Sequence, residues 1–294
     1  HMKGFDAEKY VNHAKEIIAK SLKVDPKEIF FTSGGTESDN WAIKAAAQML
    51  KEKGRHIITS KIEHHAILNS CAYLEKQGFE VTYLDVDEYG KVNPADVEAA
   101  IRPDTILISV MYANNEIGTI QPIAEIGEIC RAAGVLFHTD AVQAIGHVPV
   151  SITGAKVDML SLSAHKFHGP RGVGVLYVRR GVPFSTLIEG GAQERGKRAG
   201  TENLPAIAGM ATALAESLAN LSENARRVSA MRDRLIAGLS EIPASHLNGD
   251  PTHRVPGIVN FCFEGIEGES LLLMLDAKGI AASSGSACTS GSLD

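Results

Sequence analysis

Two short apolar runs that each end in a polar cluster constrain this chain more than any other feature. The first run ends at Asp140, and the second, residues 159–163, ends just before Lys166. Apolar runs bounded in this way are typical of strands buried on both faces of a parallel sheet. Ligands of open α/β folds bind at the carboxyl ends of such strands. The pattern therefore predicts that neighbouring strand ends present a carboxylate and an amine to one ligand.

A lysine that follows a buried strand has a specific chemical use. Desolvation of Lys166, which lies close to several glycines, would leave a neutral amine that can form a Schiff base. Pyridoxal phosphate requires such a lysine together with an acid for its pyridine nitrogen, and Asp140 is the candidate for that acid. Taken singly, each residue is more simply explained as a solvated loop lysine or a turn residue. The interpretation therefore depends on the pair and on the motifs described below.

Length and charge narrow the class of protein. The chain has 294 residues, of which 44% are hydrophobic, which is ample for a packed core. A net charge of −6 without any block of like charges gives no indication of a nucleic-acid or membrane partner. No apolar run is long enough to span a bilayer, and no secretory leader is evident. We therefore expect a soluble cytoplasmic protein.

The four cysteines are scattered and form no Cys-x-x-Cys pair, which argues against a disulfide framework and a structural zinc site, so we expect no metal. Cys71 and Cys130 lie in helical patterns and Cys262 lies in an apolar run, so all three are predicted to be buried. Cys288 is different, because residues 283–292 are mostly serine and glycine and carry no large apolar side chain before residue 293.

Predicted strands and helices alternate along the first two thirds of the chain, which favours a mostly parallel sheet covered by helices on both faces. A boundary near Asn220 is expected to separate a large domain, 1–220, from a smaller C-terminal α/β domain, 221–294. The predicted strands are 29–32, 56–60, 80–86, 105–113, one ending near Asp140, 159–163, an antiparallel 172–178, 257–263 and 280–282.

Several connections between these elements are rich in polar residues. Ser33-Gly34-Gly35-Thr36 stands between a strand and a helix and predicts a phosphate cup, although an ordinary turn capped by Thr36 is the simpler alternative. His64 follows a strand, where it is equally explained as a ring-stacking and proton-transfer residue or as a helix cap. The loop 190–203 carries three cations, several glycines and no evident core residue, which favours a functional or interface loop.

Together these segments resemble cysteine desulfurases of the NifS/IscS type, which are class V aminotransferase-like enzymes of pyridoxal phosphate fold type I. The match runs in order from about residue 29 to residue 292. It includes Thr32-Ser33-Gly34-Gly35-Thr36-Glu37-Ser38, Glu63-His64-His65, Asn114-Asn115-Glu116-Ile117-Gly118, Asp140-Ala141-Val142-Gln143, Ser163-Ala164-His165-Lys166, Gln193 to Asn203, and Ser283 to Cys288.

The resemblance implies a role for each matching position. Lys166 would bind pyridoxal 5'-phosphate covalently, Asp140 would pair with its ring nitrogen, and His64 would stack on the ring. Cys288 would accept the sulfur of L-cysteine as a persulfide and leave L-alanine. The remaining cofactor contacts implied are Gly35, Thr36, Asn115, Gln143, Ser163, His165 and, from the partner subunit of a homodimer, Thr201.

The loop around Cys288 is similar to that of the family's long-loop branch, which implies sulfur delivery to iron-sulfur scaffolds or other acceptor proteins. The family's N-terminal strand and the rest of its small domain, including the arginine for the substrate carboxylate, have no counterpart in this sequence. A selenocysteine lyase, another fold type I enzyme, and a non-catalytic protein that keeps the fold therefore stay open as alternatives.

Overall fold

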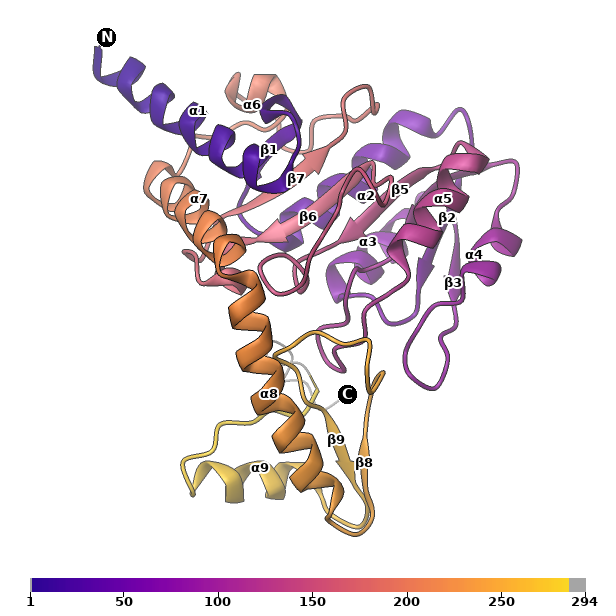
Figure 1. The fold of residues 1–294 in the computed structure, drawn as a ribbon. Helices are drawn as coiled ribbons and strands as arrows, with labels where there is room; N and C mark the ends of the chain where they lie inside the picture. Colours follow the sequence, from indigo (N-terminus) through magenta and orange to yellow (C-terminus); the bar gives the residue numbers. More distant parts are fainter. Residues whose placement is uncertain (1, 286–294) are drawn as a thin grey trace.

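A seven-stranded sheet forms the centre of the computed structural model, which describes residues 2–285 (Figure 1). The strand order is β1-β7-β6-β5-β4-β2-β3. Only β7 runs against its neighbours, β1 and β6, as predicted for residues 172–178. The strands are β1 Ile29–Thr32, β2 His56–Ser60, β3 Glu80–Leu84, β4 Thr105–Ser109, β5 Leu136–Asp140, β6 Met159–Ser163 and β7 Gly174–Val178.

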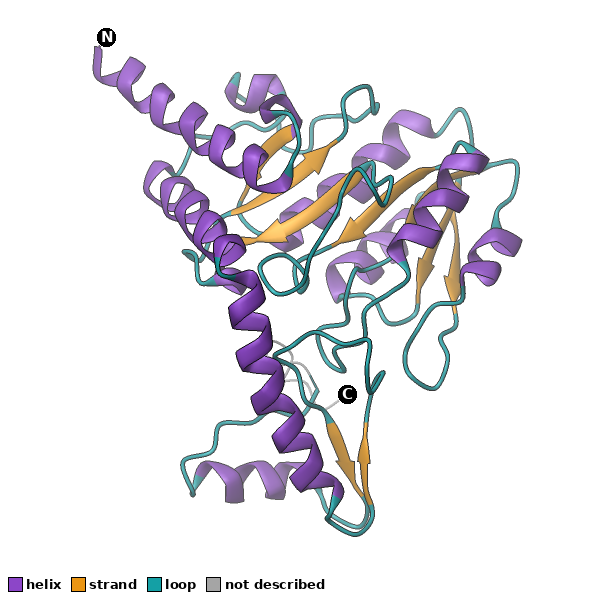
Figure 2. Ribbon diagram, viewed as in Figure 1, coloured by secondary structure: helices purple, strands orange, loops and turns teal. Residues whose placement is uncertain are grey.

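Helices cover both faces of this sheet (Figures 1 and 2), and each face has its own hydrophobic core. Helices α1, α4, α5 and α7 lie on one face, while α2 and α3 lie on the other. Every residue of β1, β2, β4, β6 and β7 is buried, as the apolar runs predicted. The helices are α1 Met2–Leu22, α2 Gly35–Leu50, α3 His65–Glu75, α4 Pro94–Ala100, α5 Ile123–Ala133 and α7 Leu204–Ala219.

The chain leaves the sheet along α8, Leu221–Ser240, which meets α7 at a bend of 72° next to Asn220. Beyond it, β8 Ser245–Leu247 and β9 Phe261–Phe263 pair in an antiparallel ribbon, and α9 Gly268–Asp276 follows (Figure 1). Within residues 2–285 no single helix has the length and apolar character to cross a membrane. Among the described helices, only α7 and α8 taken together are long and apolar enough, and this pair is bent.

Four predicted elements near the C-terminus or at strand ends were wrong. β3 and β4 end two and four residues earlier than predicted, although the N–H groups of Val110 and Tyr112, beyond β4, still donate to the carbonyls of His138 and Asp140 in β5. Residues 257–260 and 280–282 form no strand, and β8 lies in a passage predicted to consist of turns. In these segments apolar and polar residues alternate over too few positions to identify a strand.

Cys262 is exposed rather than buried, which corrects a second prediction. It lies at the middle of β9, directly opposite His246 of β8, and both side chains face solvent. Successive residues of a strand point to opposite faces, so the apolar neighbours Phe261 and Phe263 face the other way. Cys71 and Cys130 are buried, as predicted.

Candidate active site at the carboxyl edge of the sheet

The carboxyl ends of β1, β2, β4, β5 and β6 lie at one edge of the sheet, because these five strands run in the same direction. Asp140 is the last residue of β5. Lys166 lies in the 3-10 helix Ala164–Phe167 directly after β6, and His64 follows β2. The structure therefore brings together the three residues that the sequence placed at separate strand ends.

The Asp140 carboxyl group is 6% exposed and accepts a hydrogen bond of 2.9 Å from the backbone N–H of Val142. Burial raises its pKa above the usual value, while the Val142 N–H and the charges of His64 and Lys166 act in the opposite direction. Asp140, His64 and Lys166 therefore lie close enough for their charges to interact. A ligand that brings a further positive charge to Asp140 would favour its ionised form.

The backbone around Lys166 is fixed on several sides. His147 Nε2 donates to the Lys166 carbonyl at 2.7 Å, and the hydroxyl of Ser217 donates to the carbonyl of Phe167 at 3.2 Å. His168 ends the 3-10 helix in a left-handed conformation, with φ of 68°. These contacts hold the backbone at Lys166. The residue itself is only half-buried, which leaves its amine accessible to a ligand. Nothing in the sequence pattern identified His147 or Ser217, since both act through long-range contacts to carbonyl groups.

His64 caps helix α3, and its Nδ1 accepts a hydrogen bond of 3.1 Å from the backbone N–H of Ala66. The capping alternative is thus confirmed. In the neutral form of the ring, Nδ1 is the acceptor and the proton lies on Nε2. The cap therefore orients the ring and presents its N–H edge, so capping is compatible with a second role toward a ligand.

Glu63, next to His64, is 5% exposed and was not singled out from the sequence. Its Oε1 accepts from the Ser60 hydroxyl at 2.6 Å and from the Met111 N–H at 2.9 Å. Burial is the main cause that raises its pKa to about 8. Glu63 therefore ties the end of β2 to the segment after β4 as a largely neutral carboxylic acid at neutral pH.

The start of α2 has the features of an anion site. The N-cap is Gly34 rather than Thr36, and no side chain within the described part of the protein caps this helix. Gly34 has a φ of 152°, a conformation that favours glycine. Its backbone packs closely against β7, since a Cβ added to Gly174 would lie only 2.7 Å from the Gly34 Cα. The first N–H groups of α2 and its dipole are therefore open to a phosphate.

Ser163 and His165 lie beside this helix start. A Cβ on Gly34 would be 3.6 Å from the Ser163 hydroxyl, which itself is 2.9 Å from His165 Nδ1. His165 is exposed, and partial burial followed by the charges of Lys166 and Arg171 lowers its pKa. Hydroxyl and imidazole groups thus stand where the helix N–H groups open, as a phosphate site requires.

Asn115 and Gln143 are half-buried and follow β4 and β5 at the same edge. Their neighbour Asn114 has a structural role that the sequence did not reveal. Its amide donates to the Ile62 carbonyl at 3.0 Å and accepts from the N–H groups of Glu116 and Ile117. Asn114 thereby connects the loops that follow β2 and β4, which carry His64 and Asn115.

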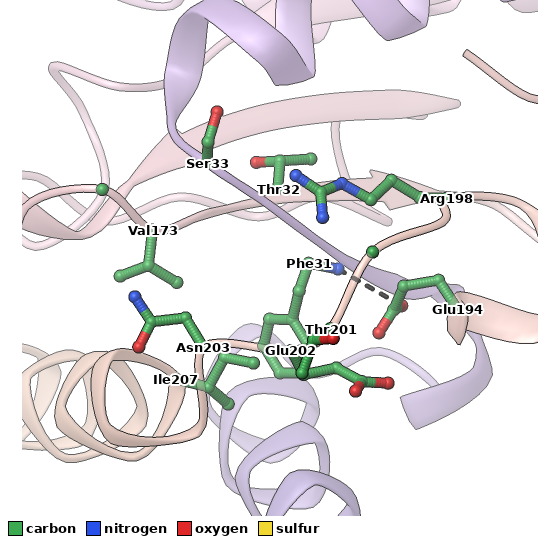
Figure 3. A pocket seen from close by; sticks show the side chains of 12 residues that line it. Phe31, Thr32, Ser33, Val173, Glu194, Arg198, Thr201, Glu202, Asn203 and Ile207 are labelled. Atoms are coloured by element: carbon green, nitrogen blue, oxygen red, sulfur yellow. Dashed lines mark hydrogen bonds between the residues drawn. The ribbon is translucent and has the colours of Figure 1, made fainter. Parts of the chain in front are cut away.

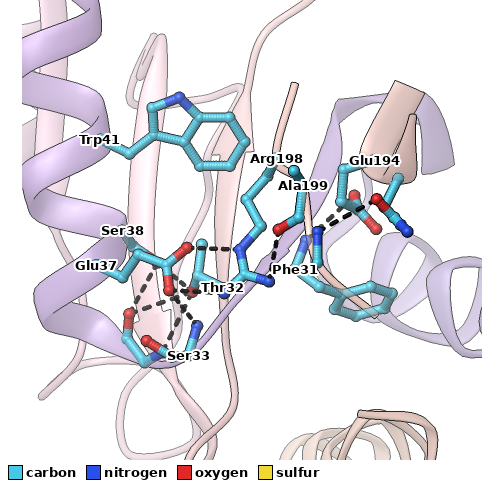
Figure 4. Close-up of polar contacts among 12 residues, drawn as sticks. Phe31, Thr32, Ser33, Glu37, Ser38, Trp41, Glu194, Arg198 and Ala199 are labelled. Carbon is cyan, nitrogen blue, oxygen red and sulfur yellow. Dashed lines mark hydrogen bonds and ion pairs between the residues drawn. The ribbon is translucent and has the colours of Figure 1, made fainter. Parts of the chain in front are cut away.

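The loop 190–203 does contact the core, contrary to the prediction. Glu194, in the short helix α6 Gln193–Gly196, is 6% exposed and pairs with Lys15 of α1 at 2.7 Å. Arg198 forms a two-bond ion pair with Glu37 of α2 at 2.8 and 3.0 Å (Figure 4). Glu37 also accepts from the Ser33 N–H at 2.9 Å. No core residue was evident in the sequence of this loop because burial of paired charges leaves no apolar signal.

A cavity of about 130 Å³ lies between this loop and the end of β1 (Figure 3). Thr201 lines it together with Ser33 and Arg198, and Asn203 and Ile207 face it from the start of α7. Thr201 thus lies near the loop that precedes α2 in its own chain. Within residues 2–285, no cluster of three or more histidine, cysteine, aspartate or glutamate side chains is arranged to hold a metal ion.

Comparison with known proteins identifies the family of this chain. The profile of the aminotransferase class-V family matches residues 1–294. The chain is 60% identical to the cysteine desulfurase IscS of Methanosarcina thermophila, covering 97% of this chain and 70% of that protein. It is 56% identical to the cysteine desulfurase IscS of Clostridium botulinum strain Hall, covering 97% and 73%.

Solved structures agree with this result. A NifS-like protein that is 43% identical superimposes with a TM-score of 0.94, over 97% of this chain and 78% of its own. DndA from Streptomyces lividans, 39% identical, gives a TM-score of 0.88 over 94% and 79%. The chain therefore belongs to the class-V aminotransferase family of pyridoxal phosphate enzymes, with the fold type I architecture. Within that family its relatives named above are cysteine desulfurases.

The residues present fit the cofactor of this family. The Asp140 carboxylate accepts one hydrogen bond from the Val142 N–H and can accept another from a ring N–H. Lys166 supplies an amine beside it, and the uncapped start of α2 with Ser163 supplies donors for a phosphate. The donor set thus contains one partner for each polar end of pyridoxal phosphate.

Proposed function

We propose that this protein is a cysteine desulfurase that converts L-cysteine to L-alanine and transfers the sulfur to Cys288 as a persulfide. The observation that supports this most strongly is the meeting of Asp140, His64 and Lys166 at the carboxyl edge of the sheet, in a chain 60% identical to a cysteine desulfurase. A third structural relative, SspA in complex with cysteine, is 35% identical with a TM-score of 0.84. It supports free cysteine as the substrate.

When bound, pyridoxal phosphate supplies an electron-withdrawing ring that stabilises negative charge at the substrate Cα. Lys166 would hold the cofactor covalently, and its amine would also move the Cα proton of the substrate. The Asp140 carboxylate accepts the ring N–H and keeps the nitrogen positively charged. His64, oriented by its cap on α3, covers the ring face. Gln143 would contact the ring oxygen, and Asn115 would lie near it and the substrate.

The phosphate is held by the N–H groups of Gly35 and Thr36, by Ser163 and by His165. Thr201 completes the same site from the partner subunit of a homodimer. Within its own chain Thr201 lies beside Ser33 and Arg198, near the start of α2, so the partner assignment rests on the resemblance to the family.

Cys288, which lies outside the described residues, is the sulfur acceptor. Its thiolate attacks the substrate sulfur, a sulfur–sulfur bond forms, and the carbon–sulfur bond breaks with its electron pair left on the carbon side. Protonation of that carbon gives alanine, so atoms and electrons balance without an added oxidant. The persulfide is then passed to an iron-sulfur scaffold or another acceptor protein in the cytoplasm.

Mass spectrometry after incubation with L-cysteine tests this proposal. One added sulfur atom is expected on Cys288, together with release of alanine, and Cys288→Ser is expected to bind cofactor and cysteine but form no persulfide. Cys262→Ser is the matched control, because Cys262 is exposed on β9, whereas burial raises the pKa of Cys71 and Cys130 to about 12. A persulfide on any other cysteine would overturn the assignment.

The same assay separates the alternatives. A selenocysteine lyase would release alanine from selenocysteine and not from cysteine, and another fold type I enzyme would not depend on Cys288. A non-catalytic protein would show no visible absorbance from a Lys166-bound cofactor. Repeating the assay on a chain extended to the length of the relatives tests whether residues 1–294 contain everything that turnover requires.

A further inference from the structure

A second carboxyl group lies directly behind Asp140. Asp39, in the second turn of α2, is 1% exposed, and its side chain interacts with those of Asp140 in β5 and Ser161 in β6. Helix α2 packs against these strands on the face opposite α1. Two carboxyl groups in contact inside a protein cannot both be ionised at low cost, so they hold at least one proton between them.

Within residues 2–285, the basic group that pairs with Asp39 is His138, whose Nε2 lies 3.8 Å from Asp39 Oδ1. The two ring nitrogens of His138 are engaged with the hydroxyls of Ser109 and Ser161, at 2.9 and 3.0 Å, and burial lowers its pKa to about 3. His138 is therefore neutral and supplies no compensating positive charge to Asp39.

The two carboxyl groups differ in what surrounds them. Asp140 receives the Val142 N–H and the favourable charges of His64 and Lys166. Asp39 Oδ1 has no hydrogen-bond partner within the described part of the chain, and burial is the main cause that raises the Asp39 pKa well above its usual value. The shared proton therefore belongs to Asp39.

We propose that Asp39 is a positioning residue for Asp140: a neutral carboxylic acid whose O–H donates to the Asp140 carboxylate. Together with the Val142 N–H, this bond fixes the carboxylate plane and leaves one direction open for the cofactor ring nitrogen. It also makes Asp140 less basic, so that the ring nitrogen keeps its proton. The part that concerns the cofactor rests on the proposed function, whereas the protonation of Asp39 does not.

The protonation state can be measured in the apoprotein. With aspartate labelled with ¹³C at its side-chain carboxyl carbon, one carboxyl signal is expected to stay in the protonated form at pH 7, and selective labelling removes interference from Glu63. The signal should vanish in Asp39→Asn and persist in Asp140→Asn. A wild-type protein without such a signal, or a signal lost only in Asp140→Asn, overturns the proposal. The wild-type titration requires no variant to fold.

The positioning role is tested in the cofactor-loaded enzyme with a conservative pair. Asp39→Asn keeps a neutral donor toward Asp140 and is expected to retain kcat within about threefold, while Asp39→Leu loses the donor and should lower kcat about 10- to 100-fold with little change in KM. The absorbance of the Lys166-bound cofactor should shift only in Asp39→Leu. Equal loss in both variants would mean that Asp39 serves the fold alone.

Thr139→Val is the matched control. Thr139 precedes Asp140 on β5, is fully buried, and its hydroxyl has no hydrogen-bond partner within residues 2–285. This variant removes a buried polar group near the site without touching the carboxyl pair, so kcat and the cofactor spectrum should not change. Failure of the proposed function would abolish alanine release in every variant but leave the apoprotein carboxyl signal in place, so the two outcomes are distinguishable.

Discussion

Apolar side chains are buried around the sheet edge but exposed in the segment from α8 to α9. Around the site, strands such as β6 are buried along their whole length, and Ile67 of α3 is fully covered. Neither α8 nor α9 contains a buried residue, and Leu273 is 67% exposed. The groups that would hold the cofactor are thus fixed by a packed core, whereas the segment that leads toward Cys288 is not. Cofactor binding and sulfur transfer should therefore be separable by substitution.

The largest effect is expected at Lys166. Lys166→Ala removes both the covalent link to the cofactor and the base that moves the substrate proton, so turnover should fall by more than about 10³-fold. Visible absorbance of the bound cofactor should disappear, while the melting temperature of the apoprotein stays close to that of the wild type. Normal cofactor absorbance in this variant would contradict the assignment.

Asp140→Asn should have the next largest effect. The amide cannot keep the ring nitrogen positively charged, so kcat is expected to fall about 10²- to 10³-fold while cofactor is still bound. Spectroscopic titration with pyridoxal phosphate and single-turnover kinetics would measure the two effects separately. Turnover at the wild-type rate would remove Asp140 from its proposed role.

A pair of leucine-sized truncations measures the contrast between the regions directly. Ile67→Ala in the core is expected to lower the free energy of unfolding by about 2–5 kcal/mol. Leu273→Ala on α9 should change it by less than about 0.5 kcal/mol, because that side chain is already exposed. Urea denaturation of both variants gives the comparison, and a large loss at Leu273 would show that α9 is covered in solution.

A further effect concerns the pH dependence of stability. The Glu63 pKa is raised to about 8, so the unfolded chain loses this proton near pH 4.5 while the folded protein keeps it. Stability from this group is complete below pH 4.5 and declines by at most about 1.4 kcal/mol per pH unit until pH 8. Glu63→Gln should flatten that slope in denaturation curves measured at several pH values. An unchanged slope would show that Glu63 is ionised in the folded state.

Much of the sheet was predictable because its strands are continuous apolar runs. Asp140, Lys166 and His64 could be assigned for a related reason, since parallel strands bring their carboxyl ends to one edge. Glu63, Asp39 and His147 could not, because their roles arise from contacts between elements far apart in sequence. The pairing of Lys15 with Glu194 was missed for the same reason. The division into domains near Asn220, and the individual cofactor contacts, stay predictions.

The place of β7 between β1 and β6 has a consequence for how the protein is made. β1 ends at Thr32, but β7, which is its one neighbour in the sheet among residues 2–285, ends at Val178. Roughly 150 residues must be synthesised before β1 can pair, which takes on the order of 10 s at ordinary rates of translation. During that time the strand Ile29–Thr32 and the helix start that follows it have no sheet to join. A nascent chain stalled before residue 174 should therefore depend on chaperones, whereas one stalled well beyond Val178 should not.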